Sequence, residues 1–325
     1  MIVPQARHNG TTPMLDAIEP IAIVFGTICL GFLCMKSGKM TEDQLGGLVF
    51  FAMTIALPCL IIRSFLSIDL GAVFDPDIYL AYYSAAGLIF FTGWLVALKV
   101  MKTSGIEAGL YGMSASFCNH GFIGLPVVGA TWGEPGVAIL ALIISIHPAT
   151  MFTLTITTIE LNRGEGRVTA KRLFTPLRGL VKNPIILAVV TGALLSAIKV
   201  PVPELGMTFL QTMALAAGPC ALFCVGAFLA DAKLSAMGRS VPHAVLKTVI
   251  MPLVTFVIGH QLFGLELWTA LVVAFVSGLP AGANVVMLSH YYHTAEKDVS
   301  SVVSLTTLIG MGTLPLMLWI FALVL

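Results

Sequence analysis

The chain has 325 residues, of which 58% are hydrophobic and only 10% are charged, and its mean hydropathy is +0.97. A soluble globule needs far more polar surface than this composition supplies, so we expect the chain to lie in a lipid bilayer. The net charge of +1, with no basic stripe interleaved with aromatic residues, excludes a nucleic-acid partner.

Apolar stretches long enough to cross a bilayer as a helix, about 20 residues each, recur along the whole chain. The first is a span and not a signal peptide, because Lys36 and Lys39 follow it and no small-residue cleavage site does. The predicted fold class is therefore an all-α integral membrane protein with ten transmembrane helices. We place them at residues 17–35, 46–66, 78–99, 109–132, 137–160, 183–199, 205–230, 241–263, 267–292 and 299–325.

The basic residues on alternate loops predict the orientation, because cytoplasmic loops carry an excess of Lys and Arg. One face holds fourteen: Lys36, Lys39, Lys99, Lys102, Arg163, Arg167, Lys171, Arg172, Arg178, Lys182, Lys233, Arg239, Lys247 and Lys297. The other face holds three: Arg7, Arg63 and Lys199. The first face is therefore predicted to be cytoplasmic, which places both termini on the outer side.

The triplet Gly-Leu-Pro occurs twice, at Gly124-Leu125-Pro126 and at Gly278-Leu279-Pro280, each time near the middle of an apolar stretch. Proline removes a backbone donor and clashes with the preceding turn, while glycine allows a close approach of the backbone. We therefore expect the fourth and ninth helices to open there. Non-helical backbone at this depth must be buried in protein or line a wet cavity, and paired interruptions mark transporter substrate sites.

Five spans per half make any repeat an inverted one, since the second half enters the membrane from the opposite side. The Pro-Cys pairs at Pro58 and Pro219 are 161 residues apart, and the Gly-Leu-Pro triplets are 154 apart. This predicts a first five-helix repeat over residues 1–160, a basic cytoplasmic loop at 161–182 and a second repeat over 183–325. The broken fourth and ninth helices are expected to cross near the midplane, where half-helix N-termini suit an anionic group.

Polar residues beside the two breaks are the candidates for substrate contact. They are Ser114, Ser116, Asn119 and His120 before the first break, and Ser277 and Asn284 around the second. Each asparagine either caps broken-helix backbone or binds substrate, and the two roles are compatible. His120 is either a proton carrier or carboxylate donor, or a structural histidine.

Charged residues elsewhere are predicted to contribute less. Glu160, Asp231 and Lys247 lie near cytoplasmic helix ends and are expected to reach water. No Arg or Lys is then expected near the breaks, so anion affinity would come from helix ends and amides. His147 on the fifth helix either faces the crossing or is a buried, hydrogen-bonded histidine.

Nearly the whole chain resembles the auxin efflux carrier family of bacterial permeases, relatives of the plant PIN exporters. The strongest matches are Asn119-His120-Gly121-Phe122-Ile123-Gly124-Leu125-Pro126 followed by Gly133-Glu134-Pro135-Gly136, and Leu279-Pro280-Ala281-Gly282-Ala283-Asn284. Pro58 and Asn183-Pro184 also match. The chain departs from the plant branch in lacking its long cytoplasmic loop and its second proline in the ninth helix.

The resemblance implies a ten-helix inverted-repeat carrier related to bile-acid symporters. Its scaffold would comprise the first, second, sixth and seventh helices, and its transport domain the third to fifth and the eighth to tenth. The transport domain would move as an elevator, and Asn119 would contact the substrate carboxylate. The expected substrate-binding residues are Asn119, His120, Gly121, Gly124, Pro126, Ser277, Gly278, Pro280 and Asn284.

The function expected from these features is secondary transport of a small organic anion, such as malonate, malate or an auxin-like acid, in a bacterial inner membrane. No cofactor or metal is expected, although coupling to H⁺ or Na⁺ is open, and a homodimer is a family-level expectation. The alternative is a membrane sensor or scaffold with the same fold. A channel would need a continuous polar stripe, and an intramembrane enzyme would need a motif such as His-Glu-x-x-His, which the chain lacks.

Overall fold

Helices make up nearly all of the computed structural model, which describes residues 13–67, 75–163, 182–230 and 237–324. The α-helices are α1 (Pro13–Lys36), α2 (Glu42–Phe51), α3 (Leu57–Ser67), α5 (Pro76–Leu95), α6 (Gly105–Ser116), α7 (Leu125–Arg163), α9 (Pro184–Ala197), α10 (Glu204–Ala230), α11 (Met237–Val245), α12 (Met251–Phe256), α13 (Leu267–Ser277), α14 (Asn284–Tyr292) and α15 (Glu296–Val324). Five π-helical segments interrupt or join them: η1 (Ala52–Ala56), η2 (Val96–Val100), η3 (His120–Gly124), η5 (Leu246–Ile250) and η6 (Val257–Leu262).

Within the described residues, six helical stretches are long and apolar enough to cross a membrane. They are Glu42–Ser67, Pro76–Val100, His120–Asn162, Glu204–Ala230, Gly238–Leu262 and Glu296–Val324. Many large apolar side chains on these helices are exposed, among them Leu205 and Leu262, as expected of a surface that faces lipid. An all-helical integral membrane protein is thus confirmed, and the count of ten spans stays a prediction.

Four sequence features fall wholly or mainly outside the described residues. Arg7, Lys233 and Asp231 belong to segments whose structure is not described, as does most of the predicted basic loop at 161–182.

The predicted fourth and fifth helices are joined in α7, which bends sharply at Gly133 (φ 61°, ψ −148°). Glycine is the residue that adopts this backbone conformation without strain.

The opening expected at Gly124-Leu125-Pro126 is not found there. These three residues are helical, in η3 and the first turn of α7, and the interruption lies earlier, at Phe117–Asn119. The π turn η3 ends two residues before Pro126, and η1 and η5 stand in the same register before Pro58 and Pro252. A widened turn of this kind accommodates the missing proline donor without opening the helix.

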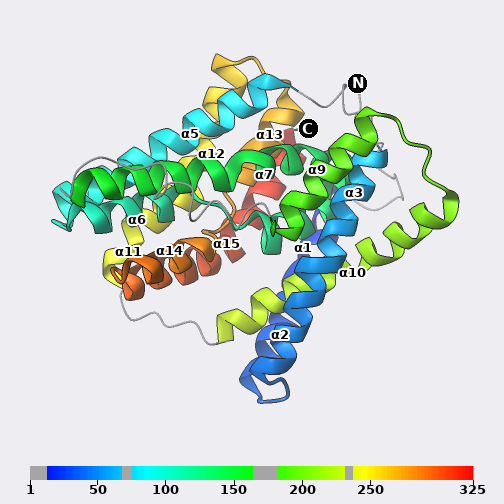
Figure 1. Cartoon of the computed structure of the whole chain (residues 1–325), viewed down its shortest axis with the longest axis horizontal. Coiled ribbons are helices and arrows are strands. Elements are labelled where there is room, and N and C mark those ends of the chain that lie inside the picture. The colour runs from blue at the N-terminus through cyan, green and yellow to red at the C-terminus, as the bar shows by residue number, and fades with distance from the viewer. Residues whose placement is uncertain (1–12, 68–74, 164–181, 231–236, 325) are drawn as a thin grey trace.

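The helices pack in two groups, which we call the α1–α10 group and the α5–α15 group. In the first, α1 lies along α10, and α3 packs against both α9 and α10. In the second, α6 packs on α5 and α7, α12 on α5 and α13, and α11 on α15. Figure 1 shows α1 to α3, α9 and α10 as a slanted layer on the right, beside the α5–α15 group on the left.

Two glycines allow the close contact between α1 and α10. A Cβ atom at Gly31 would overlap the backbone carbonyl of Phe223, and one at Gly226 would overlap that of Ile28. Small residues at such crossings let helix backbones approach closely, which is the main source of helix association in lipid. The α1–α10 group therefore depends on these two positions.

We predict that Gly226→Ala destabilises the protein by about 1–3 kcal/mol, the usual cost of overpacking. Gly218→Ala, in the same helix, is the matched control, because a Cβ there would meet nothing within 4 Å. Unfolding in increasing SDS, followed by circular dichroism, measures both. Equal stability of the two variants would contradict the close packing of α1 on α10.

Candidate functional site

Two short extended segments meet where the helices are interrupted. Cys118 and Ala281 form an isolated antiparallel β-bridge. Beside it, the Asn119 backbone N–H donates to the Pro280 carbonyl (2.8 Å), and the Gly282 N–H donates to the Phe117 carbonyl (3.2 Å). Residues from opposite halves of the chain thus satisfy each other's backbone polar groups.

Local sequence explains why the helices stop here. Asn119 is the N-cap of η3, and its Oδ1 accepts a hydrogen bond from the Phe122 N–H (3.2 Å). Gly282 lets the second segment approach, because a Cβ there would lie 2.8 Å from the Phe117 ring. Thr306 of α15 accepts a hydrogen bond from the Ala281 N–H at 3.1 Å, which secures the segment from the other side.

A cavity of about 130 Å³ lies beside this crossing, with room for more than one water molecule. Its lining combines the start of η3 and of α14 with parts of η1, α7 and α9, and it contains no Asp or Glu. The lining residues are Met53, Phe117, Cys118, Asn119, His120, Gly121, Phe122, Ile144, His147, Pro148, Asn183, Ile185, Ile186, Gly282, Ala283 and Asn284. Three helix N-termini, those of η3, α9 and α14, therefore border one small space.

Three asparagines supply amides to the cavity. Asn119 and Asn183 use their Oδ1 atoms as N-caps, Asn183 accepting from the Ile185 N–H at 2.9 Å. Asn284 is the first residue of α14 and makes no side-chain hydrogen bond with the described residues. Capping leaves the Nδ2 donors of Asn119 and Asn183 available, so the capping and binding roles of Asn119 are compatible in this geometry.

Two histidines form the buried wall of the cavity. The rings of His120 and His147 are 4.5 Å apart between centroids in an edge arrangement. The His147 Nε2 accepts from the Cys118 N–H (3.3 Å), and its Nδ1 is buried with no partner among the described residues. The Tyr82 hydroxyl lies 3.2 Å from the His120 Nε2 and 3.1 Å from the Cys118 Sγ. His147 thus both faces the crossing and is hydrogen-bonded.

Lys247 does not reach water, contrary to the sequence expectation. Its side chain is fully buried, and its ammonium donates to the Ser277 carbonyl at the end of α13, a carbonyl that also accepts from the Cys118 thiol. A helix C-terminus leaves carbonyls without helical donors and carries partial negative charge, so it stabilises a cation there. The expectation that no lysine lies near the breaks is therefore wrong, and thirteen basic residues, not fourteen, remain for the cytoplasmic count.

The predicted site residues divide into two sets. Asn119, His120, Gly121 and Asn284 line the cavity. The other predicted residues, Gly124, Pro126, Ser277, Gly278 and Pro280, do not. Gly124 packs on Leu279, Ser277 binds Lys247 through its carbonyl, and Pro280 accepts from Asn119. Ser114 and Ser116 donate to carbonyls of their own helix.

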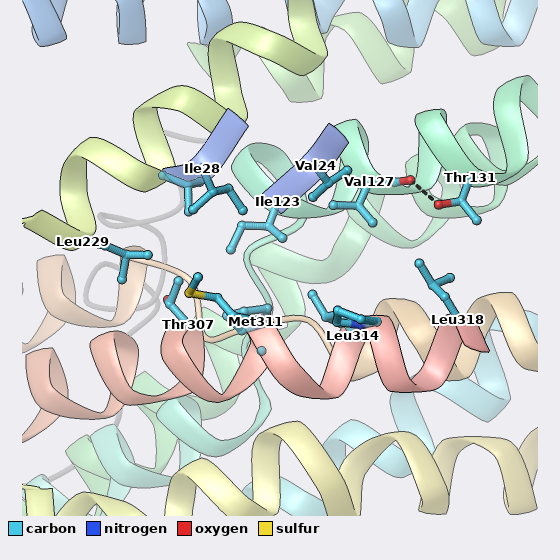
Figure 2. A pocket seen from close by; sticks show the side chains of 14 residues that line it. Val24, Ile28, Ile123, Val127, Thr131, Leu229, Thr307, Met311, Leu314 and Leu318 are labelled. Carbon is cyan, nitrogen blue, oxygen red and sulfur yellow. Dashed lines mark hydrogen bonds between the residues drawn. The ribbon is translucent and has the colours of Figure 1, made fainter. Parts of the chain in front are cut away.

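An apolar seam separates the two helix groups near the crossing (Figure 2). Val24 and Ile28 of α1 line it from one group, and Ile123 of η3 with Met311 and Leu314 of α15 line it from the other. The space left is about 20 Å³, barely enough for one water molecule. The two threonines in the lining, Thr131 and Thr307, donate to carbonyls of their own helices, so they form no hydrogen bond across the seam.

The membrane fold agrees with a comparison to known protein families. A family described as membrane transport protein matches residues 16–318. The chain belongs to the membrane transport protein family. This is the auxin efflux carrier-like family whose motifs the sequence resembles. The name of this family indicates transporters rather than enzymes.

Two curated proteins are similar to the chain. One, from Rhizobium meliloti (strain 1021), is named "Putative malonate transporter"; it is 23% identical over 298 residues, covering 91% of this chain and 93% of the relative. The other, from Methanothermobacter thermautotrophicus, is named "Uncharacterized transporter" and is 27% identical over 168 residues, covering 50% of this chain and 54% of the relative.

We predict that Lys247→Met weakens binding of labelled malonate about tenfold or more, because a positive charge near the cavity attracts an anion strongly when water is excluded. Lys99→Met makes the same charge change at an exposed position and is the matched control. Equilibrium binding to purified protein measures both, and circular dichroism checks folding. Equal binding by folded Lys247→Met and Lys99→Met would show that the buried charge does not act on the cavity.

Proposed function

We propose that the chain is a secondary transporter of a small organic anion, which binds in the cavity at the helix crossing. The observation that supports this most directly is the composition of that cavity. Asn119, Asn183 and Asn284 line it, the N-termini of η3, α9 and α14 border it, and no carboxylate does. Helix N-termini provide partial positive charge and free amides, which together bind carboxylates well.

The size of the cavity favours a small carboxylate over a bulky one. At about 130 Å³ it suits malonate or malate better than an indole ring with its acetate arm. The name of the Rhizobium relative points to the same class.

We propose an elevator mechanism, in which the α5–α15 group carries the crossing past the α1–α10 group. Two observations support it. Met53, Asn183 and Ile186 of the α1–α10 group line the cavity opposite Asn119, so a relative displacement would change its walls. The seam of Figure 2 is apolar, and no hydrogen bond between described residues crosses it, so sliding there breaks no polar contact. In this proposal the first group is the scaffold.

The proposal also includes the arrangement in the membrane. We place the chain in a bacterial inner membrane as ten spans, with both termini outside, and we keep a homodimer as the expected assembly. His120 and its partner Tyr82 offer a route for proton coupling, while the carbonyls of the crossing offer one for sodium. The experiment below separates these routes.

The test is uptake by proteoliposomes of labelled malonate, malate and indole-3-acetate under separate proton, sodium and potential gradients. Saturable flux of a small carboxylate is expected from the parent. Asn119→Ala should lower kcat/KM about 10- to 100-fold, the range for losing one hydrogen bond to a charged group. Asn162→Ala is the matched control, since Asn162 is exposed and donates to the Thr158 carbonyl of its own helix.

Two results would overturn the proposal. Saturable binding without flux under every gradient would favour a sensor with the same fold. Flux that responds equally to Asn119→Ala and Asn162→Ala would place the substrate outside the cavity at the crossing.

A further inference from the structure

A second cavity, larger than the first, lies between α3, α7 and α10. Its volume is about 330 Å³, within the range of about 300–1,000 Å³ usual for small-molecule sites. Most of its lining is apolar or glycine, and its charged members are one arginine and one glutamate. The lining residues are Leu60, Arg63, Ser64, Leu125, Pro126, Gly129, Ala130, Gly133, Glu134, Val137, Gln211, Ala214, Leu215, Gly218 and Pro219.

The two charged residues form an ion pair across the helix groups. Arg63 of α3 binds Glu134 of α7, and each side chain is 26% exposed. The bend at Gly133 sets the direction of the chain immediately before Glu134. Arginine has five donors in a planar fork, and one carboxylate occupies two of them, so Arg63 has the geometry to receive a second carboxylate or to exchange one for another.

A third polar group completes the cavity. Gln211 of α10 has a buried Oε1 with no hydrogen-bond partner among the described residues. Rotating this side-chain amide by about 180° would place Nε2, with its two N–H donors, where Oε1 now lies. The Ser64 hydroxyl is not available to donate to a ligand, because it donates to the Leu60 carbonyl (2.9 Å). Arg63 and Gln211 thus provide donors from α3 and α10, respectively.

The same helix connects this cavity to the crossing. His120, Gly121 and Phe122 line the first cavity, and the chain from Leu125 to Glu134 lines the second. Ten residues of helix span about 15 Å, so the two spaces lie in succession along one membrane-crossing segment. An anion at Arg63 is therefore placed on a path to or from Asn119.

From this geometry we infer that the Arg63 cavity is a second carboxylate site, in which a substrate carboxylate replaces Glu134 on Arg63. The inference rests on the proposed function and adds an access site to it. Because Glu134 competes for the same guanidinium, binding there is weak and reversible. Because the ion pair links the two helix groups, its replacement also removes a polar tie between them.

The first test is equilibrium binding of labelled malonate to purified protein in an Asn119→Ala background, which weakens the crossing site. Adding Glu134→Gln, which keeps the shape of the side chain but removes the competing charge, should raise the remaining affinity about tenfold. Further addition of Arg63→Gln should abolish that gain. Lys199→Gln, at an exposed lysine, is the matched control for loss of a cation. An affinity that is the same with and without Glu134→Gln would overturn the second site.

The second test is flux, measured with the anion added to either side of oriented proteoliposomes. Glu134→Gln should lower the KM about tenfold for anion added on the Arg63 side and leave the KM on the opposite side unchanged. If Arg63→Gln and Glu134→Gln change kcat alike and leave both KM values unchanged, the pair is a structural tie only and the inference is wrong. Absence of saturable flux in the parent would instead contradict the proposed function, while the binding test still decides on the second site.

Discussion

Backbone amides and carbonyls that leave a helix inside a membrane must find partners within the protein, and the crossing depends on this constraint. The extended residues Phe117–Asn119 and Pro280–Gly282 meet it by pairing with each other. Neither interruption is stable alone, since each would expose unsatisfied groups at a cost of several kcal/mol. Pairing therefore fixes the two half-helix N-termini beside one cavity, where their partial charges can meet a polar ligand.

The same interruptions explain the buried lysine. The end of α13 leaves the Ser277 carbonyl without a helical donor, and Lys247 donates to it. The partial negative charge of that helix end stabilises the ammonium, so the lysine needs no buried carboxylate. A positive charge on Lys247 would add to the partial charges at the starts of η3 and α14. The half-helix N-termini and the lysine thus favour an anion as ligand, while the backbone carbonyls of the crossing are acceptors that suit a cation.

The sequence predicted the helical membrane fold well, because the length and hydropathy of a membrane helix are set by the surrounding lipid and not by packing against other helices. The sequence also predicted that Asn119 caps the helix after the break, since an asparagine before an apolar run is an N-cap signal. The sequence misplaced the first interruption. A π turn before Pro126 lets the helix continue through the proline, and the amino-acid composition does not reveal where such a turn forms. It missed Lys247 and Tyr82, since only the three-dimensional packing brings η5 and α5 to the crossing.

Polar and apolar contacts between the two helix groups have opposite consequences for movement. The seam lined by Val24, Ile123 and Leu314 is apolar, so its energy changes little as one surface slides on the other. The Arg63–Glu134 pair is directional, so its energy is lost once its atoms separate. An anion that replaces Glu134 on Arg63 would keep the guanidinium satisfied while freeing the groups from each other. Movement would then depend on the presence of the substrate class that the crossing itself binds.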